Sequence, residues 1–173
     1  MPFPNRRLTH VKTLTEFELG FIIGLIDGEG TITINDKIRK QRFVWKNKPK
    51  NKKDYRQLIP HVSVCNTNLE IIEKVKETIN CGYITVNKAR PEHNQKEHYR
   101  FHLENLSDIE QLLNQISEKL IVKRKQAKIL LEFCRLRLDK MALHPNRIDL
   151  ARYGDEEKLM VEEIRKLNKR GLR

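Results

Sequence analysis

The segment FIIGLIDGEG, residues 21–30, is followed directly by TITINDKIRKQ, residues 31–41. The first segment continues a helix whose start is marked upstream by Thr15 and Glu18, because Thr-x-x-Glu is the pattern of a capping box. The sequence therefore predicts a helix that begins near residue 15 and ends at the DGEG turn.

Beyond Gly30 the hydrophobic period changes from that of a helix to two residues, which is typical of a strand with one buried face. Ile32, Ile34 and Ile38 share the face that we expect to be core. The opposite face is polar and cationic, and it carries Thr31, Thr33, Asn35, Lys37, Arg39 and Gln41.

Capping boxes of the same kind predict further helices. Thr67-x-x-Glu70 and Ser107-x-x-Glu110 each precede an apolar helical period and predict the starts of two helices. The periodicity also predicts helices over about 123–140 and 155–169.

Three further strands are predicted between these helices, at residues 55–65, 82–89 and 98–105. Their expected inward-facing residues are Leu58, Val62, Val64, Ile84, Val86, Tyr99, Phe101 and Leu103. Their polar faces carry Tyr55, Gln57, His61, Ser63, Tyr83, Thr85, Asn87, His98, Arg100 and His102. The order αββαββ followed by helices predicts an α+β domain with one antiparallel sheet, dry on one face and wet on the other.

Composition restricts the classes of function. The chain has 173 residues and a formal charge of +12, which favours nucleic acid as a partner and an anionic membrane surface as the second candidate. The longest apolar run, residues 21–26, is far shorter than the ~20 residues of a membrane helix. Pro2 and Pro4 interrupt the apolar core that a secretory signal needs. We therefore expect an intracellular protein, in the cytoplasm of a prokaryote or in an organelle. Because nucleic acid is the favoured partner, we expect no membrane partner and no small-molecule substrate.

The 3 cysteines form an odd set without C-x-x-C spacing. This pattern supports neither a zinc knuckle nor a disulfide framework. We expect all of them to be reduced and structural.

Gly20, Gly24 and Gly28 are spaced four apart and fall on one face of the first helix. Glycine inside a helix costs roughly 1 kcal/mol relative to alanine, so a stripe of three indicates close approach of another backbone. The stripe indicates either a helix contact between subunits, which we favour, or tight packing inside one subunit.

Asp27 and Glu29 place two acids where the helix gives way to the strand. A carboxylate at a helix end, with glycines that permit close approach, is suited to a hard divalent cation. Taken alone, the same DGEG sequence is also compatible with an ordinary structural turn.

Residues 22–30, IIGLIDGEG, stand at the nine positions of the LAGLIDADG motif. With the predicted αββαββα order, the chain resembles the single-motif LAGLIDADG homing endonucleases, whose antiparallel sheet forms a DNA-binding saddle. The resemblance implies a core domain at 15–140, between an N-terminal extension at 1–14 and a C-terminal helical extension at 141–173. It also implies a homodimer that contacts through Gly20, Ile23, Gly24, Asp27 and Gly28.

The resemblance further implies site residues. Glu29 stands where the family has its metal-binding acid, commonly Asp, and the Gly28 carbonyl is a possible second ligand of Mg²⁺. Lys123 corresponds to the family's active-site lysine, although Arg124 and Lys125 are adjacent competitors. Asn66 corresponds to a polar residue that holds water, or it is only a turn residue. Asp27 is expected to be structural, bonding backbone near the helix end.

The polar strand faces listed above supply donors and acceptors that read base edges, so we expect them to bind double-stranded DNA. Residues 37–56 add 10 Lys or Arg against 1 acid, which predicts a basic loop that follows phosphate. The implied function is a site-specific endonuclease that makes a staggered double-strand break in a long pseudo-palindromic target. An intron RNA-splicing maturase and a non-catalytic DNA-binding regulator are the alternatives.

Overall fold

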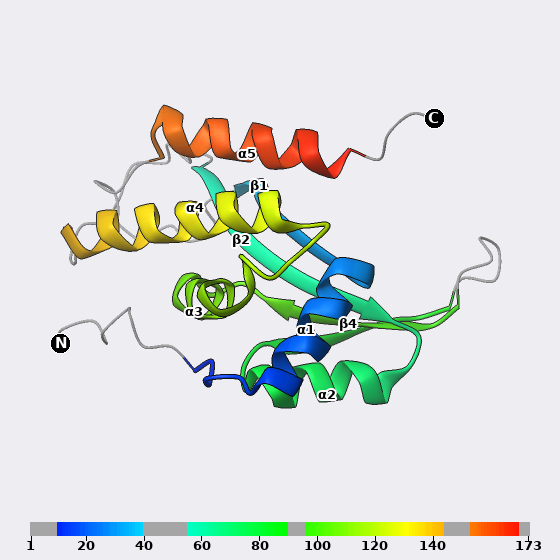
Figure 1. Cartoon of the computed structure of the whole chain (residues 1–173). Helices are drawn as coiled ribbons and strands as arrows, with labels where there is room; N and C mark the ends of the chain where they lie inside the picture. Colours follow the sequence, from blue (N-terminus) through cyan, green and yellow to red (C-terminus); the bar gives the residue numbers. More distant parts are fainter. Residues whose placement is uncertain (1–9, 40–54, 90–95, 144–152, 170–173) are drawn as a thin grey trace, which may run out of the picture.

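A computed structural model of the chain describes residues 10–39, 55–89, 96–143 and 153–169 (Figure 1). The predicted αββαββ order with trailing helices is confirmed. In chain order the elements are α1 (Glu16–Glu29), β1 (Gly30–Arg39), β2 (Tyr55–Asn66), α2 (Leu69–Ile79), β3 (Tyr83–Asn87), β4 (His98–Leu103), α3 (Leu106–Ile116), α4 (Arg124–Leu143) and α5 (Asp155–Asn168). Within the described ranges, no helix is both long enough and apolar enough to cross a membrane.

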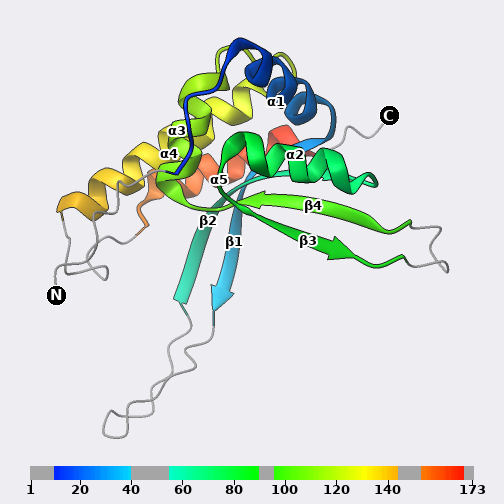
Figure 2. The same cartoon turned by 90° about the horizontal axis from the view of Figure 1, so that it is seen from below.

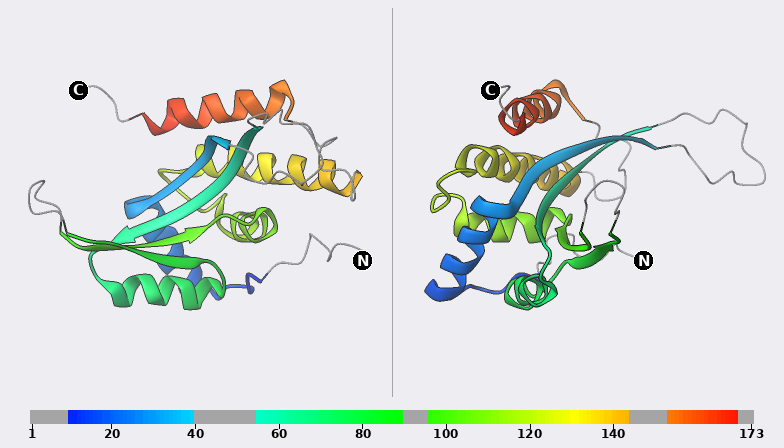
Figure 3. Two further views of the ribbon diagram at one scale, coloured as in Figure 1. Left: turned by 180° about the vertical axis from the view of Figure 1, so that it is seen from behind. Right: turned by 90° about the vertical axis from the view of Figure 1, so that its right-hand side faces the viewer.

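The four strands form one antiparallel sheet in the order β1-β2-β4-β3. The β1–β2 and β3–β4 hairpins point in different directions, and the helices lie to one side of the sheet (Figure 2). The views in Figure 3 show the same arrangement from behind and from the side. In the described part of the chain the second face is therefore left uncovered.

The dry face of the sheet was largely predictable from strand alternation. Ile32, Ile34, Leu58, Val62, Val64, Phe101 and Leu103 are all buried in one core with the helices. Ile84 and Tyr99 are only partly buried against this core. The prediction of a core position is wrong for two residues, because Ile38 is 75% exposed and Val86 is 56% exposed. Both lie one residue before the end of their strands, β1 and β3. Figure 2 shows the end of β1 projecting away from the helices.

The helix starts show which capping signals operate. At α1 the predicted capping box is present, with Glu18 N–H donating to Thr15 and the Glu18 carboxylate accepting from Thr15. At α2 and α3 the predicted Thr67 and Ser107 caps are wrong. Asn68 and Asn105 cap these helices instead, through their side-chain oxygens, and asparagine is at least as good a cap as serine or threonine.

Helix α5 packs onto the same core through Met160, Val161 and Ile164. Asn168 Nδ2 donates to Ile32 O at 2.9 Å, so the C-terminal helix is tied to the first strand. The helix begins at Asp155, as predicted, and ends one residue earlier than predicted.

A buried ion cluster joins α5 to α4. The Glu157 carboxylate is fully buried and lies 3.0 Å from Arg137 and 2.8 Å from Lys140. Burial alone would raise the pKa of Glu157, but its hydrogen bonds to Lys140, Arg137 and the Gly154 amide outweigh this and lower it.

Candidate active site and nucleic-acid interface

The Glu29 carboxylate is exposed at the last residue of α1. Gly30 pairs with Val64, so the start of β1 lies beside the end of β2. Asn66, the last residue of β2, therefore reaches Glu29, and its Nδ2 donates to Glu29 Oε2 at 2.6 Å. Asn66 Oδ1 also accepts from the Asn68 amide at 2.8 Å. Both readings of Asn66, a site residue and a turn residue, are consistent with these contacts.

Asp27 anchors the loop between α3 and α4. Its carboxylate accepts hydrogen bonds from the backbone amides of Ile121, Val122 and Lys123 at 2.7, 3.2 and 3.0 Å. Partial burial alone would raise the pKa of Asp27, but the three amides and the Lys123 charge outweigh it and lower the pKa. The carboxylate therefore stays charged and bonds backbone, which agrees with the expected structural role, although the partner loop is 94–96 residues away.

Lys123 is brought to the same helix end by this loop. Its Nζ donates to the Asp27 carbonyl at 2.6 Å, where the last carbonyls of a helix attract a cation. Partial burial lowers the pKa of Lys123, against the opposing effect of the Asp27 charge. Arg124 instead bonds Leu120 O, and Lys125 is exposed. Of these adjacent cations, Lys123 therefore bonds α1 directly.

The three residues expected to be catalytic therefore meet at the final turn of α1. Asn66 bonds Glu29, and Lys123 bonds the carbonyl of Asp27. Three separate parts of the chain supply them: α1, the end of β2 and the α3–α4 loop. Their chemical roles remain predictions.

The donor set at this helix end suits a hard divalent cation. Glu29 offers carboxylate oxygens, and Gly28 is exposed with one of the last four carbonyls of the helix, which have no intrahelical partner. The negative end of the helix dipole adds to the attraction. Oxygen ligands that leave room for phosphate and water are what Mg²⁺ requires, so Glu29 and Gly28 fit the ion that the sequence implies.

The glycine stripe of α1 forms an open face. Gly20, Gly24 and Gly28 are exposed, and an added Cβ at any of them meets nothing within 4 Å. Close packing inside one subunit is therefore not the reason for the stripe in the described residues. Ile23 and Asp27, also expected at this interface, are half-buried.

Exposed apolar side chains border this face, and sequence reasoning missed them. Phe17 is 85% exposed on the same helix, while Ile121 and Val122 are 83% and 67% exposed on the loop that Asp27 holds. The spacing of Phe17 from the glycines was a usable signal. The position of residues 121 and 122 beside α1 was not, because only tertiary structure brings the loop there.

The polar faces of the four strands are in register. Thr33 pairs with His61, Ser63 with His102, and Thr85 with Arg100. The predicted DNA-contacting residues that are exposed or half-buried are Thr31, Thr33, Asn35, Lys37, Gln57, Tyr83, Thr85, Asn87, His98, Arg100 and His102. His61 and Ser63 are buried, at 8% and 3% exposed. Arg39 and Tyr55 lie in strands, but the structure does not describe their side chains. Gln41 and the rest of residues 40–54, in the predicted basic loop, lie outside the described residues.

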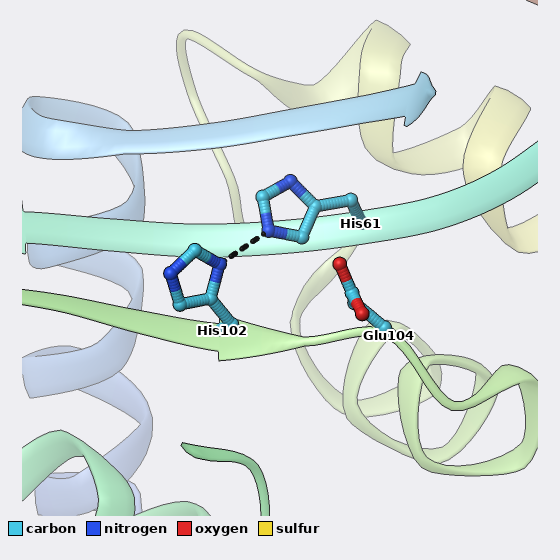
Figure 4. A group of neighbouring side chains, drawn as sticks. All are labelled: His61, His102 and Glu104. Carbon is cyan, nitrogen blue, oxygen red and sulfur yellow. Dashed lines mark hydrogen bonds between the residues drawn. The ribbon is translucent and has the colours of Figure 1, made fainter. Parts of the chain in front are cut away.

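Two of the predicted DNA-contacting residues bond one another. His61 Nε2 and His102 Nδ1 are 2.9 Å apart across β2 and β4, and the Glu104 carboxylate lies beside them (Figure 4). Burial, and secondarily the His102 charge, lowers the pKa of His61 to about 4. Burial also lowers the pKa of His102. Strand alternation placed the two histidines on one face, but their direct contact depends on the register between strands far apart in sequence.

The fold is shared with solved homing endonucleases. The archaeal intron-encoded homing endonuclease I-Vdi141I, in complex with DNA, has 24% identity and a TM-score of 0.64, with 91% of this chain and 88% of that chain covered. The homing endonuclease I-CvuI, in complex with its target, has 16% identity and a TM-score of 0.63, with 91% and 85% covered. The group I intron-encoded homing endonuclease I-CeuI, in complex with DNA, has 14% identity and a TM-score of 0.60, with 90% and 69% covered.

No match is found among curated protein sequences. The sequence model of the LAGLIDADG endonucleases, in contrast, matches residues 22–136. This range runs from the motif in α1 into α4 and covers well over half of the chain. The match and the shared fold lead to one conclusion: this chain belongs to the LAGLIDADG endonuclease family.

Proposed function

We propose that the chain is a site-specific double-stranded DNA endonuclease that works as a homodimer and cuts by metal-dependent phosphodiester hydrolysis. The observation that carries this proposal is the exposed Glu29 carboxylate, which Asn66 holds at the end of α1 and which lies two residues from the carbonyl bound by Lys123. A family member that only bound DNA would gain nothing from an acid held against phosphate.

The open face of α1 supports the homodimer. Three glycines allow the backbones of two such helices to approach closely, and Phe17, Ile121 and Val122 supply apolar surface beside them. A two-fold axis along this face would bring the two Glu29 residues toward each other, because each is at the end of the same helix. Two active sites would then cut one strand each and leave a staggered break.

The residues at the helix end have distinct tasks in this proposal. Glu29 binds the divalent cation, with Gly28 as a second oxygen donor, and Asn66 orients the Glu29 carboxylate. The bound cation would supply activation of water and stabilisation of charge at phosphorus. Lys123 places a positive charge near the scissile phosphate, and Asp27 positions Lys123 by holding its loop.

The uncovered sheet face supports recognition of a long DNA site. Its side chains are hydroxyls, amides, imidazoles and cations, the groups that bond base edges in the major groove. A 10-residue β1 strand at about 3.3 Å per residue extends about 33 Å, which is close to one turn of B-DNA. A dimer would therefore cover about two turns, with half-sites related by the two-fold axis.

The decisive experiment compares the parent with Glu29→Gln on DNA that carries the intronless form of its locus, in Mg²⁺. We expect the parent to make a double-strand break that EDTA abolishes. Glu29→Gln should lose cleavage and keep DNA affinity or bind more tightly, because a negative charge near phosphate has been removed. Glu77→Gln is the matched control, since Glu77 is exposed on α2 and pairs there with Lys74, away from the end of α1. Cleavage by Glu29→Gln at the parent rate would overturn the assignment.

The alternatives give different results in the same experiment. A non-catalytic regulator would bind this DNA and leave it intact in the parent. A maturase would promote splicing of the intron transcript, and its activity would survive Glu29→Gln because splicing does not use this carboxylate as a nuclease ligand.

A further inference from the structure

We propose that His61, His102 and Glu104 form a second metal site, which binds one transition-metal dication such as Zn²⁺ through two imidazole nitrogens and one carboxylate oxygen. This site has a different donor set from the one at the end of α1, and it does not depend on the nuclease assignment. Figure 4 shows the three side chains converging from β2, β4 and the turn that follows β4.

The geometry is close to that of a coordinated ion. One ligand atom from each residue lies within 4.8 Å of the other two, and the two imidazole nitrogens are 2.9 Å apart. For an ion at about 2.05 Å from both nitrogens, this separation gives an N–ion–N angle of about 90°. A tetrahedral angle would require the nitrogens to be about 3.3 Å apart. Binding would therefore need the two nitrogens to part by about 0.4 Å, both rings to turn so that their lone pairs converge, and the Glu104 carboxylate to move closer. These are adjustments of side chains and leave the strands in place.

The hydrogen bonds around the pair are compatible with the required tautomers. His102 Nε2 lies 2.8 Å from Thr85 Oγ1, and when Nε2 donates to this hydroxyl, Nδ1 has a free lone pair. In the metal-free pair, His61 Nε2 then carries the proton that is shared with His102 Nδ1. When a cation replaces this proton, His61 becomes the Nδ1–H tautomer and no net proton is released. A second-sphere acceptor for the outer ring nitrogen is the usual partner of a metal-bound histidine.

The surroundings also hold the ligands in place. His61 is 8% exposed, and Tyr83 stacks on the His102 ring with centroids 4.8 Å apart. Two histidines and one carboxylate with an open fourth position match the donor set of many zinc sites. Mg²⁺ prefers an all-oxygen shell, so imidazole ligands favour Zn²⁺, Ni²⁺ or Cu²⁺ over the cation proposed at Glu29.

The test is a calorimetric titration of the full chain with ZnCl₂ in the presence of excess Mg²⁺, which keeps oxygen-rich sites occupied. We expect one Zn²⁺ per chain and a rise in melting temperature on binding, because the ligands come together only in the folded state. Co²⁺ in place of Zn²⁺ should give visible absorption bands of the cobalt ion once the imidazoles coordinate it.

Substitutions in and around the cluster distinguish Zn²⁺ binding at this site from Zn²⁺ binding elsewhere on the chain. Glu104→Gln and His61→Asn should each weaken Zn²⁺ binding by at least ~100-fold, and Thr85→Val by about 10-fold, since loss of an outer-sphere partner costs about 10- to 100-fold. His98→Asn and Glu97→Gln are matched controls on or beside β4, outside the cluster, and should bind as the parent does. Glu29→Gln should also keep Zn²⁺ binding.

Two results would overturn the proposal. No binding of Zn²⁺ or Co²⁺ by the parent would mean that the histidines form a hydrogen-bonded pair only. Binding that survives Glu104→Gln and His61→Asn but disappears in Glu29→Gln would place the ion at the end of α1. If His61→Asn fails to fold, Glu104→Gln decides the question, because Glu104 is half-buried and its amide keeps the shape of the side chain.

Discussion

Replacing Asp27 with asparagine tests how α1 positions the loop that carries Lys123. In the parent, Oδ1 of Asp27 accepts from the amides of Val122 and Lys123, and Oδ2 accepts from the amide of Ile121. Asparagine retains one acceptor oxygen and presents an NH₂ group to the remaining amide. The substitution therefore keeps the size of the side chain and removes its charge and one of its hydrogen bonds.

The expected cost can be worked from these bonds. A hydrogen bond to a charged group contributes about 1.5–3 kcal/mol, and the lower end applies because Asp27 is only half-buried. Loss of the Ile121 bond therefore costs about 1.5 kcal/mol, and the two remaining bonds weaken by a few tenths each as they become neutral. We expect a total loss of about 2 kcal/mol in the free energy of unfolding.

Urea unfolding at one fixed protein concentration measures this loss. Asp155→Asn is the matched control, because Asp155 is exposed and forms a surface ion pair with Lys158, and we expect little change there. Cleavage by Asp27→Asn should also fall by roughly 10-fold, corresponding to about 1.4 kcal/mol, as Lys123 becomes less well held.

The pH dependence gives an independent check. The pKa of Asp27 is lowered in the folded protein, so its stabilising effect is complete above the ordinary Asp pKa of about 3.9. It is lost as pH falls through the lower folded pKa. The gap between parent and variant should therefore be constant near neutral pH and close in acid. A variant within about 0.5 kcal/mol of the parent at pH 7 would refute the anchoring role, since that is the usual effect of a surface substitution.

Three further predictions follow from the structure. Lys123→Ala should slow cleavage by more than ~10-fold with little loss of DNA affinity, and equal losses in kinetic and binding assays would instead make it a phosphate clamp. Gly24→Leu should convert a dimer to a monomer in sedimentation, because overpacking between two backbones costs roughly 1–3 kcal/mol or more; a parent that is monomeric both free and on DNA would contradict the interface. Glu157→Gln should lower the free energy of unfolding by about 3 kcal/mol, because it removes the buried anion that bonds the buried Arg137 and the half-buried Lys140. An unchanged urea midpoint would show that water enters this cluster.

Local patterns predicted most of the secondary structure and the orientation of the strands. Side chains alternate strictly along a strand, so the sequence placed Ile34, Val62 and Phe101 in the core without any tertiary information. The capping box could be predicted because its two partners, Thr15 and Glu18, lie within one helical turn. The motif at residues 22–30 determined the family for the same reason, since its residues are contiguous.

Tertiary structure decided every feature that depends on contact between distant segments. The exposure of Ile38 depends on where the helices stop covering the sheet. The Asp27 anchor joins residues 94–96 positions apart, and the pairing of His61 with His102 depends on the β2–β4 register. Sequence specifies which face of an element is apolar, because that is a local periodicity. The partner of each side chain is settled only when packing of the whole core fixes how the elements meet.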